Sequence, residues 1–156
     1  MSPADLPYRP CVGIVLANPA GLIFLGERKG HPGAWQMPQG GIDEGEAPRD
    51  AALRELQEET GIQPQAVEIL AEHPDWLSYD LPPEIRGGAF RGRYRGQTQR
   101  WFLLRYSGRD GDISLDQTEF AAWRWADSDT AIDAIVGFKR PIYREVFSHF
   151  SQFLGS

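Results

Sequence analysis

The chain contains one cysteine, and none of its apolar runs approaches the length of a membrane span. A single cysteine cannot form an internal disulfide bond. Residues 1–10 lack the positively charged segment and following apolar segment of a secretory signal, and no repeat or long low-complexity tract occurs. These absences predict a cytoplasmic protein that is not inserted in a membrane. Cys11 lies in an apolar run without a partner at metal-ligand spacing, which predicts a core position.

The composition is that of an acidic globular protein. With 156 residues, 41% hydrophobic and 24% charged, the chain is predicted to form one domain over residues 1–156. A net charge of −6 argues against non-specific coating of nucleic acid. Residues 85–109, however, hold seven arginines and no acid. Aromatic residues lie among them, namely Phe90, Tyr94 and Trp101. This stretch either holds a polyanion and stacks bases, or is a solubilising loop followed by an ordinary strand.

Residues 40–62 combine a glycine-rich turn with a helix. Pro48 suits a first helical turn and Gly61 a helix end, so the helix is predicted over 48–60. Three glutamates at spacing i, i+3 and i+4 fall within roughly a 100° arc of it: Glu55, Glu58 and Glu59. Their charges repel, and Arg54 is the one cation in the helix past its first turn. Such a cluster is either a solvated acidic face or a site for a hard cation, Mg²⁺ or Mn²⁺, that bridges to phosphate oxygens.

Nine residues of this stretch resemble the signature of the Nudix hydrolase family. The signature is glycine, five residues, glutamate, seven residues, then Arg-Glu-aliphatic-any-Glu-Glu-any-Gly-aliphatic. The matching residues are Gly40, Glu46, Arg54, Glu55, Leu56, Glu58, Glu59, Gly61 and Ile62. Chance would produce such a match with a probability on the order of 10⁻⁸. The resemblance implies an α/β fold, the Nudix α/β/α sandwich with a mixed sheet between helical layers, and metal-dependent hydrolysis of nucleotide phosphoanhydride bonds.

The resemblance also implies roles for single residues. The expected metal ligands are Glu55, Glu58, Glu59 and Glu119, and the expected catalytic residues are Glu58, Glu119 and Arg54. Structural positions of the motif are Gly40, Gly41, Glu46 and Gly61, with Glu46 steadying the turn by a charge pair to Arg54. Expected substrate contacts are Arg28, Gln39, Gly40, Tyr79 and Lys139. Without the resemblance, Glu119 would be an ordinary loop acid, and Arg28 and Lys139 would be surface charges or phosphate contacts.

Six further stretches resemble one branch of the family, the bacterial RNA pyrophosphohydrolases and plant-type dinucleoside polyphosphate hydrolases. They are residues 8–10, 35–42, 76–79, 94–103, 119–125 and 138–140. The branch implies 5′-triphosphorylated RNA as the substrate, with release of pyrophosphate, or alternatively diadenosine tetraphosphate. Hydrolysis of free oxidised nucleoside triphosphates is less favoured. So is a non-catalytic module that only binds RNA or a nucleotide, because such a module would not need all three glutamates.

The remaining elements are predicted from turn residues and apolar patterning. Strands are expected at residues 11–17, 22–27, 35–39, 67–79 with a break near His73, 98–106 and 121–125. Residues 18–21 form the expected hairpin turn. A short helix should begin after Asp127 and end near residue 136, and a last helix should run from Pro141 to about residue 153. His31 is expected in a loop.

Overall fold

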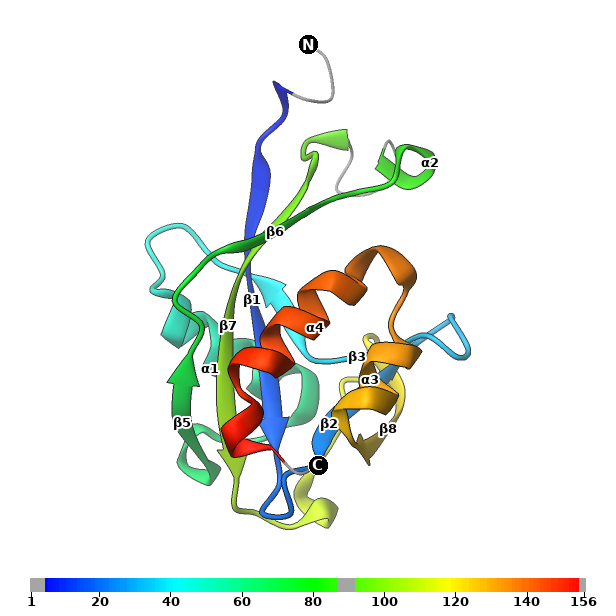
Figure 1. The fold of residues 1–156 in the computed structure, drawn as a ribbon. Helices are drawn as coiled ribbons and strands as arrows, with labels where there is room; N and C mark the ends of the chain where they lie inside the picture. Colours follow the sequence, from blue (N-terminus) through cyan, green and yellow to red (C-terminus); the bar gives the residue numbers. More distant parts are fainter. Residues whose placement is uncertain (1–4, 87–91, 155–156) are drawn as a thin grey trace.

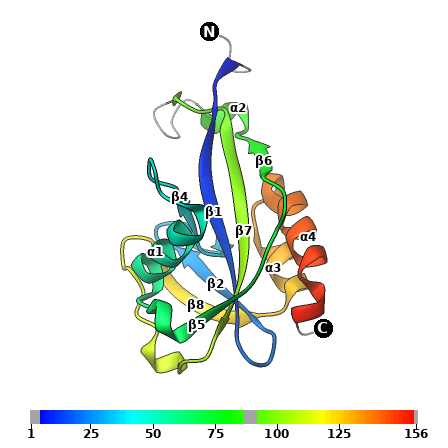
Figure 2. The ribbon, with the colours of Figure 1, turned by 90° about the vertical axis from the view of Figure 1, so that its left-hand side faces the viewer.

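The computed structural model describes residues 5–86 and 92–154. Within this part, eight strands form one mixed sheet around β1 (Tyr8–Ala17). β1 pairs in parallel with β7 (Gly96–Tyr106), whereas the other strand pairs are antiparallel. The helix α1 (Pro48–Thr60) covers one face, and α3 (Ser128–Ala134) and α4 (Arg140–His149) cover the other, as Figures 1 and 2 show. The predicted α/β/α sandwich is therefore confirmed.

The strand order is β3-β2-β1-β7-β5, with β4 added on β1, β6 on β7 and β8 on β2. The other strands are β2 (Ile23–Arg28), β3 (Trp35–Gln36), β4 (Gln39–Gly41), β5 (Val67–Glu72), β6 (Leu77–Asp80) and β8 (Phe120–Ala126). The hairpin, the break after β5 and the last two strands lie where the sequence predicted them. That the whole range 1–156 forms one domain stays a prediction.

The two central strands are buried on both faces. Ile14 and Phe102 pack on the α1 side of the sheet, whereas Val15 and Leu103 pack on the α4 side. Successive side chains of a strand point to opposite faces, so a strand between two helical layers must be apolar at every position. This explains the unbroken apolar runs of β1 and β7.

Helix α1 has the predicted bounds. Pro48 occupies its first turn, and Gly61 ends it with φ of +72° while its N–H bonds the Gln57 carbonyl. Ala52 and Leu56 are buried against the sheet. The glutamates lie on another side of the helix, toward β4, so burial of the apolar side fixes the direction in which the carboxylates point.

Three expectations about secondary structure were wrong. The strand expected over 35–39 is split, because Pro38 has no N–H for a strand ladder and the Met37 N–H donates to the Tyr143 hydroxyl at 2.8 Å. The last helix ends at His149, and a single 3₁₀ turn, Ser151–Phe153, follows it. A short helix, α2 (Pro83–Arg86), occurs where only a loop was expected.

In its described part, the arginine-rich stretch does not place Trp101 at the surface, because this side chain is fully buried. Base stacking by Trp101 is therefore wrong, and its alternative assignment to an ordinary buried strand is confirmed. Arg95 forms an ion pair with Asp80 at 2.9 Å, and Arg100 pairs with Glu72. Phe90 and Arg91 lie outside the described residues.

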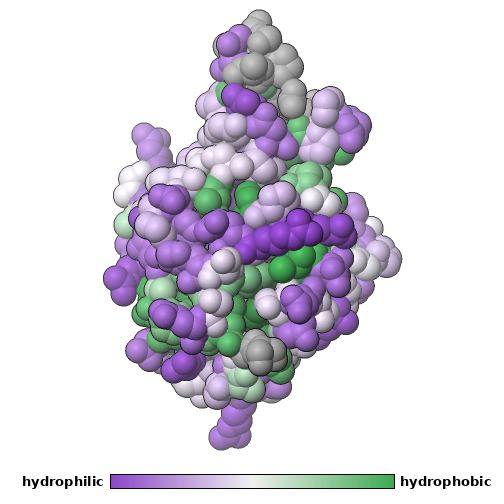
Figure 3. Space-filling view, in the orientation of Figure 1, coloured by the Kyte–Doolittle hydropathy of each residue, from purple (hydrophilic) through white to green (hydrophobic). Residues whose placement is uncertain are grey.

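On the face drawn in Figure 3, hydrophobic residues appear as patches between hydrophilic residues. No helix in residues 5–86 and 92–154 could cross a membrane.

Candidate active site

A cavity of about 380 Å³ opens where β4, β6 and β7 meet helix α1 and the segment before α4. Its lining brings together residues from both ends of the chain: Arg9, Arg28, Gln36, Gln39, Gly40, Gly41, Glu55, Glu59, Tyr79, Leu81, Ile85, Gln97, Glu119, Phe138 and Lys139. Nine of the residues singled out from the sequence are in this list. The cavity thus joins the acidic helix to the basic positions expected to contact phosphate.

Carboxylates form one wall of the cavity. Glu55, Glu59 and Glu119 line it, and Glu58 is close enough to repel the charges of Glu55 and Glu59. The Glu59 side chain is only 4% exposed, and its Oε2 is buried without a hydrogen-bond partner among the described residues. An unsatisfied buried carboxylate oxygen is costly unless a cation or donor completes it. Carboxylate oxygens are the ligands that a hard divalent cation prefers, so Glu55, Glu58, Glu59 and Glu119 are candidate ligands. Among the described residues, however, the group of three whose ligand atoms lie within 4.8 Å of one another is His73, Glu145 and His149, not these glutamates.

Burial and neighbouring negative charges raise the pKa values of the carboxylates Glu55 and Glu59. Burial, followed by the charges of Glu55 and Glu119, raises the pKa of Glu59 to about 9, although the Gln39 N–H bonds its carboxylate. Burial also raises the pKa of Glu55, against the opposing effect of Arg54. Without a cation, Glu59 consequently holds a proton at neutral pH.

Arg54 connects the turn to the carboxylates. Its guanidinium bonds both oxygens of Glu46 at 2.9 Å, the Gly41 carbonyl at 2.9 Å and Glu55 at 2.9 Å. It also reaches Glu58 at 3.3 Å. Glu46 in turn accepts from the Asp43 N–H at 3.0 Å, which holds the glycine-rich turn. A planar guanidinium can donate two parallel hydrogen bonds to one carboxylate, as Arg54 does to Glu46. This pairing with Arg54 lowers the pKa of Glu46 to about 2.

Gly40 stands where a side chain would collide with the cluster. A Cβ built on it would overlap the Glu55 carboxylate. Gly41 is similarly close to the Arg9 guanidinium. The two glycines therefore let strand β4 pass against the carboxylates, in addition to any role in approaching phosphate.

Two cations and an aromatic ring also line the cavity. Arg28 and Lys139 line it, and the Lys139 Nζ lies 5.5 Å from the centre of the Tyr79 ring. Burial, then the charge of Arg28, lowers the pKa of Lys139 to about 8. Positive groups and carboxylates that line one cavity suit a polyanion that reaches the carboxylates through a cation.

Sequence reasoning missed several cavity residues. Arg9, Gln36, Gln97 and Phe138 line the cavity but were noticed only as parts of similar stretches. Alternation on β7 offered a signal for Gln97, because polar residues on the face of a buried strand are uncommon. The sequence gives no such signal for Arg9 and Phe138, because only the folded topology brings them to the cavity.

The proton on Glu59 leads to a prediction. Mg²⁺ must displace it, so binding at pH 7 should release about one proton, and affinity should rise about tenfold per pH unit below pH 9. The folded pKa of about 9 exceeds the ordinary value of 4.5. The metal-free protein should therefore lose stability as pH rises between these values. Titration calorimetry in buffers of different ionisation enthalpy measures the released proton.

The control for this prediction is Glu59→Gln, which keeps the shape of the side chain but cannot release a proton. Its residual Mg²⁺ binding should depend less on pH than that of the wild type. An equal pH slope in both proteins would assign the proton to another group.

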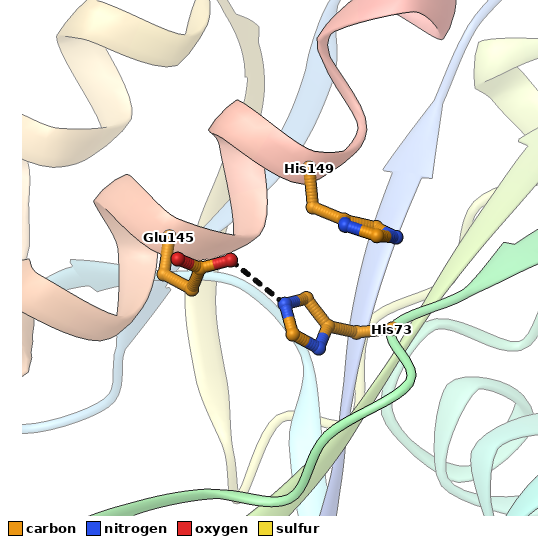
Figure 4. Close-up of side chains that lie close together, drawn as sticks. All are labelled: His73, Glu145 and His149. Atoms are coloured by element: carbon orange, nitrogen blue, oxygen red, sulfur yellow. Dashed lines mark hydrogen bonds and ion pairs between the residues drawn. The ribbon is translucent and has the colours of Figure 1, made fainter.

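A second group of potential metal ligands lies apart from the cavity lining. Figure 4 shows His73, Glu145 and His149, whose ligand atoms lie within 4.8 Å of one another. The Asp75 N–H donates to His73 Nδ1 at 3.1 Å, so the proton of this neutral ring is on Nε2, which donates to Glu145 at 2.9 Å. The lone pair of His73 thus points away from the other two residues. The group holds α4 against the segment after β5 without offering three free ligands.

Fold and site together define a class of protein: an α/β/α sandwich whose central helix presents a carboxylate cluster suited to a divalent cation. A family model described as NUDIX domain matches residues 7–146. An RNA pyrophosphohydrolase of Cereibacter sphaeroides is 58% identical over 153 residues, covering 96% of this chain and 94% of the relative. One of Dinoroseobacter shibae is 52% identical, covering 99% and 100%. A Caenorhabditis elegans Ap4A hydrolase structure has the same fold, with a TM-score of 0.70 at 21% identity over 92% of this chain and 98% of that one.

The chain belongs to the Nudix family. It is a Nudix hydrolase, an enzyme acting on phosphoanhydride bonds, and such hydrolases generally depend on a divalent metal.

Proposed function

We propose that this chain hydrolyses the 5′-triphosphate end of RNA in a Mg²⁺-dependent reaction and releases pyrophosphate. The observation that carries the proposal is the identity of 58% over nearly the full length of a relative named RNA pyrophosphohydrolase. The cavity supports it, because its acidic and basic walls suit a polyphosphate and a cation together. Mn²⁺ is the alternative cation, since both ions prefer carboxylate oxygens.

The reaction adds water to a phosphorus atom and breaks one phosphoanhydride bond. To release pyrophosphate, water attacks the α-phosphorus, the bond to the bridging oxygen breaks, and the RNA keeps a 5′-monophosphate. A divalent cation held by Glu55, Glu58, Glu59 and Glu119 would supply charge neutralisation and lower the pKa of bound water. Arg28 and Lys139, which line the same cavity, would hold phosphate oxygens.

One carboxylate must accept the proton of the attacking water. Arg54 hydrogen-bonds both Glu55 and Glu58, so part of the acceptor capacity of these two carboxylates is already taken. Glu119 lines the cavity from an exposed loop position, and it is outside this Arg54 network in the described part of the chain. We therefore assign the proton acceptor to Glu119, with Glu58 and Arg54 positioning the cluster.

Diadenosine tetraphosphate is the second candidate substrate, because it presents the same phosphoanhydride chemistry. The likeness to the Ap4A hydrolase structure does not favour it, since a match at 21% identity reports only the fold. The RNA reading thus rests on the closer sequence relatives.

The test offers both substrates to the wild-type protein with Mg²⁺ and identifies the products. We expect a higher kcat/KM for triphosphorylated RNA than for diadenosine tetraphosphate, with pyrophosphate and 5′-monophosphorylated RNA as products. A preference for the dinucleotide would replace the RNA assignment with the second candidate. Turnover of neither substrate would contradict both.

A further inference from the structure

Three side chains on one face of β7 are hydrogen-bonded in series. Gln97, Gln99 and Trp101 alternate along the strand and therefore point to the same side of the sheet. Their exposed fractions are 5%, 2% and 0%. Polar side chains buried this deeply need hydrogen-bond partners, and here they find them in one another.

The indole of Trp101 sets the direction of this series. Its Nε1–H can only donate, and it donates to Gln99 Oε1 at 3.0 Å. The Gln99 amide must then direct its NH₂ group the other way. That group donates to Gln97 Oε1 at 2.9 Å and to Gln39 Oε1 at 3.1 Å. One donor-only group thus fixes the orientation of three amides, which hydrogen-bond geometry alone would leave ambiguous.

The result of this arrangement appears at the cavity. Gln39 and Gln97 both line it, and the oxygen of each amide is taken by Gln99. Because each oxygen faces Gln99, the NH₂ group is the part of each amide best placed to meet a ligand. Gln39 comes from β4, and its backbone N–H bonds Glu59, so one of these donors lies beside the carboxylate wall.

We propose that Trp101 and Gln99 are positioning residues that make Gln39 and Gln97 a pair of neutral donors for phosphate oxygens of the substrate. This inference deepens the proposed function and rests on it. Phosphate oxygens are acceptors only, and Arg9, Arg28 and Lys139 in the same lining favour an anion over a base edge. Neutral donors would hold such oxygens without adding positive charge beside a cation bound at the glutamates.

The sharpest test reverses the polarity of the series. In Gln99→Glu the carboxylate still accepts from Trp101, but its second oxygen can only accept. Gln39 and Gln97 must then rotate to donate to it, and their carbonyl oxygens would face the cavity. The matched control is Gln36→Glu, which adds the same charge to the same cavity at a residue outside these hydrogen bonds. Gln99→Met removes the connection without adding charge.

The measurement is the Kd of methylenediphosphonate, a non-hydrolysable diphosphate, determined by calorimetry with Mg²⁺. We expect Gln99→Glu to weaken binding at least about tenfold more than Gln36→Glu, since two charge-assisted hydrogen bonds are lost. Gln99→Met should fall between Gln99→Glu and the wild type. Melting curves show whether each variant is folded, and Gln99→Met carries the test if the charged variant does not fold.

Three outcomes would overturn the proposal. Equal weakening by Gln99→Glu and Gln36→Glu would mean that charge alone matters. Wild-type affinity in Gln99→Met would mean that the amides need no positioning. A change in adenosine binding, with diphosphonate binding unchanged, would assign the donors to the base. Because diphosphonate binding requires no turnover, failure of the RNA assay would contradict the proposed function and leave this test valid.

Discussion

Replacing Glu58 by Gln should lower kcat by about 10²-fold or more and leave the fold intact. The Glu58 side chain is 56% exposed, so the change removes little packing. It does remove one carboxylate from the cluster and a partner of Arg54, which weakens both the cation site and the positioning of Glu55. Steady-state kinetics at saturating Mg²⁺, together with a melting curve, measures the two effects separately.

Glu68→Gln is the matched control, because Glu68 is an exposed glutamate on β5 outside the cavity lining. It should retain the wild-type kcat. A Glu58→Gln variant as active as this control would remove Glu58 from the catalytic machinery, and a strongly lowered melting temperature would indicate a structural role.

Gly40→Ala should also abolish most of the activity, by a different route. The added methyl group would overlap the Glu55 carboxylate, which is the movable end of a flexible side chain. Gly40 is not among the described glycines with positive φ, so alanine fits the backbone there. We expect Glu55 to swing away at a small cost in stability, with kcat reduced about 10²-fold because a catalytic group misplaced by about 1 Å loses that much.

The control is Gly111→Ala, where a Cβ would meet no atom of residues 5–86 and 92–154 within 4 Å. Both variants should melt within a few degrees of the wild type, while only Gly40→Ala loses turnover and Mg²⁺ affinity. Full activity in Gly40→Ala would show that Glu55 can move without consequence, and would exclude it as a metal ligand.

Local signals made helix α1 predictable. Proline at its start, glycine at its end and glutamates on one arc are properties of a single short stretch, and the structure reproduces the bounds Pro48–Thr60. The two-sided burial of β1 and β7 also followed from their unbroken apolar runs. In these cases the information lies within one element, so no knowledge of the topology was needed.

Contacts between distant segments were not predictable in the same way. The strand expected over 35–39 divides because Met37 bonds Tyr143, more than one hundred residues away. That Trp101 packs against Gly13, whose missing side chain makes room for the ring, could not be read from the strand pattern, which left a binding surface open as an alternative. The amide series that joins β4 to β7 depends on the same topology. Sequence patterns therefore identified the carboxylates that line the cavity. They did not identify Trp101 and Gln99, which orient the side-chain amides of Gln39 and Gln97.

The glutamates of α1 and Glu119 are expected to bind a divalent cation together. Electron paramagnetic resonance of added Mn²⁺ tests this directly, because binding removes the signal of the free ion. We expect the wild type and Glu68→Gln to bind Mn²⁺ equally, and Glu59→Gln to bind it at least about tenfold more weakly. Equal binding by Glu59→Gln and the wild type would contradict the assignment of the cation to this cluster.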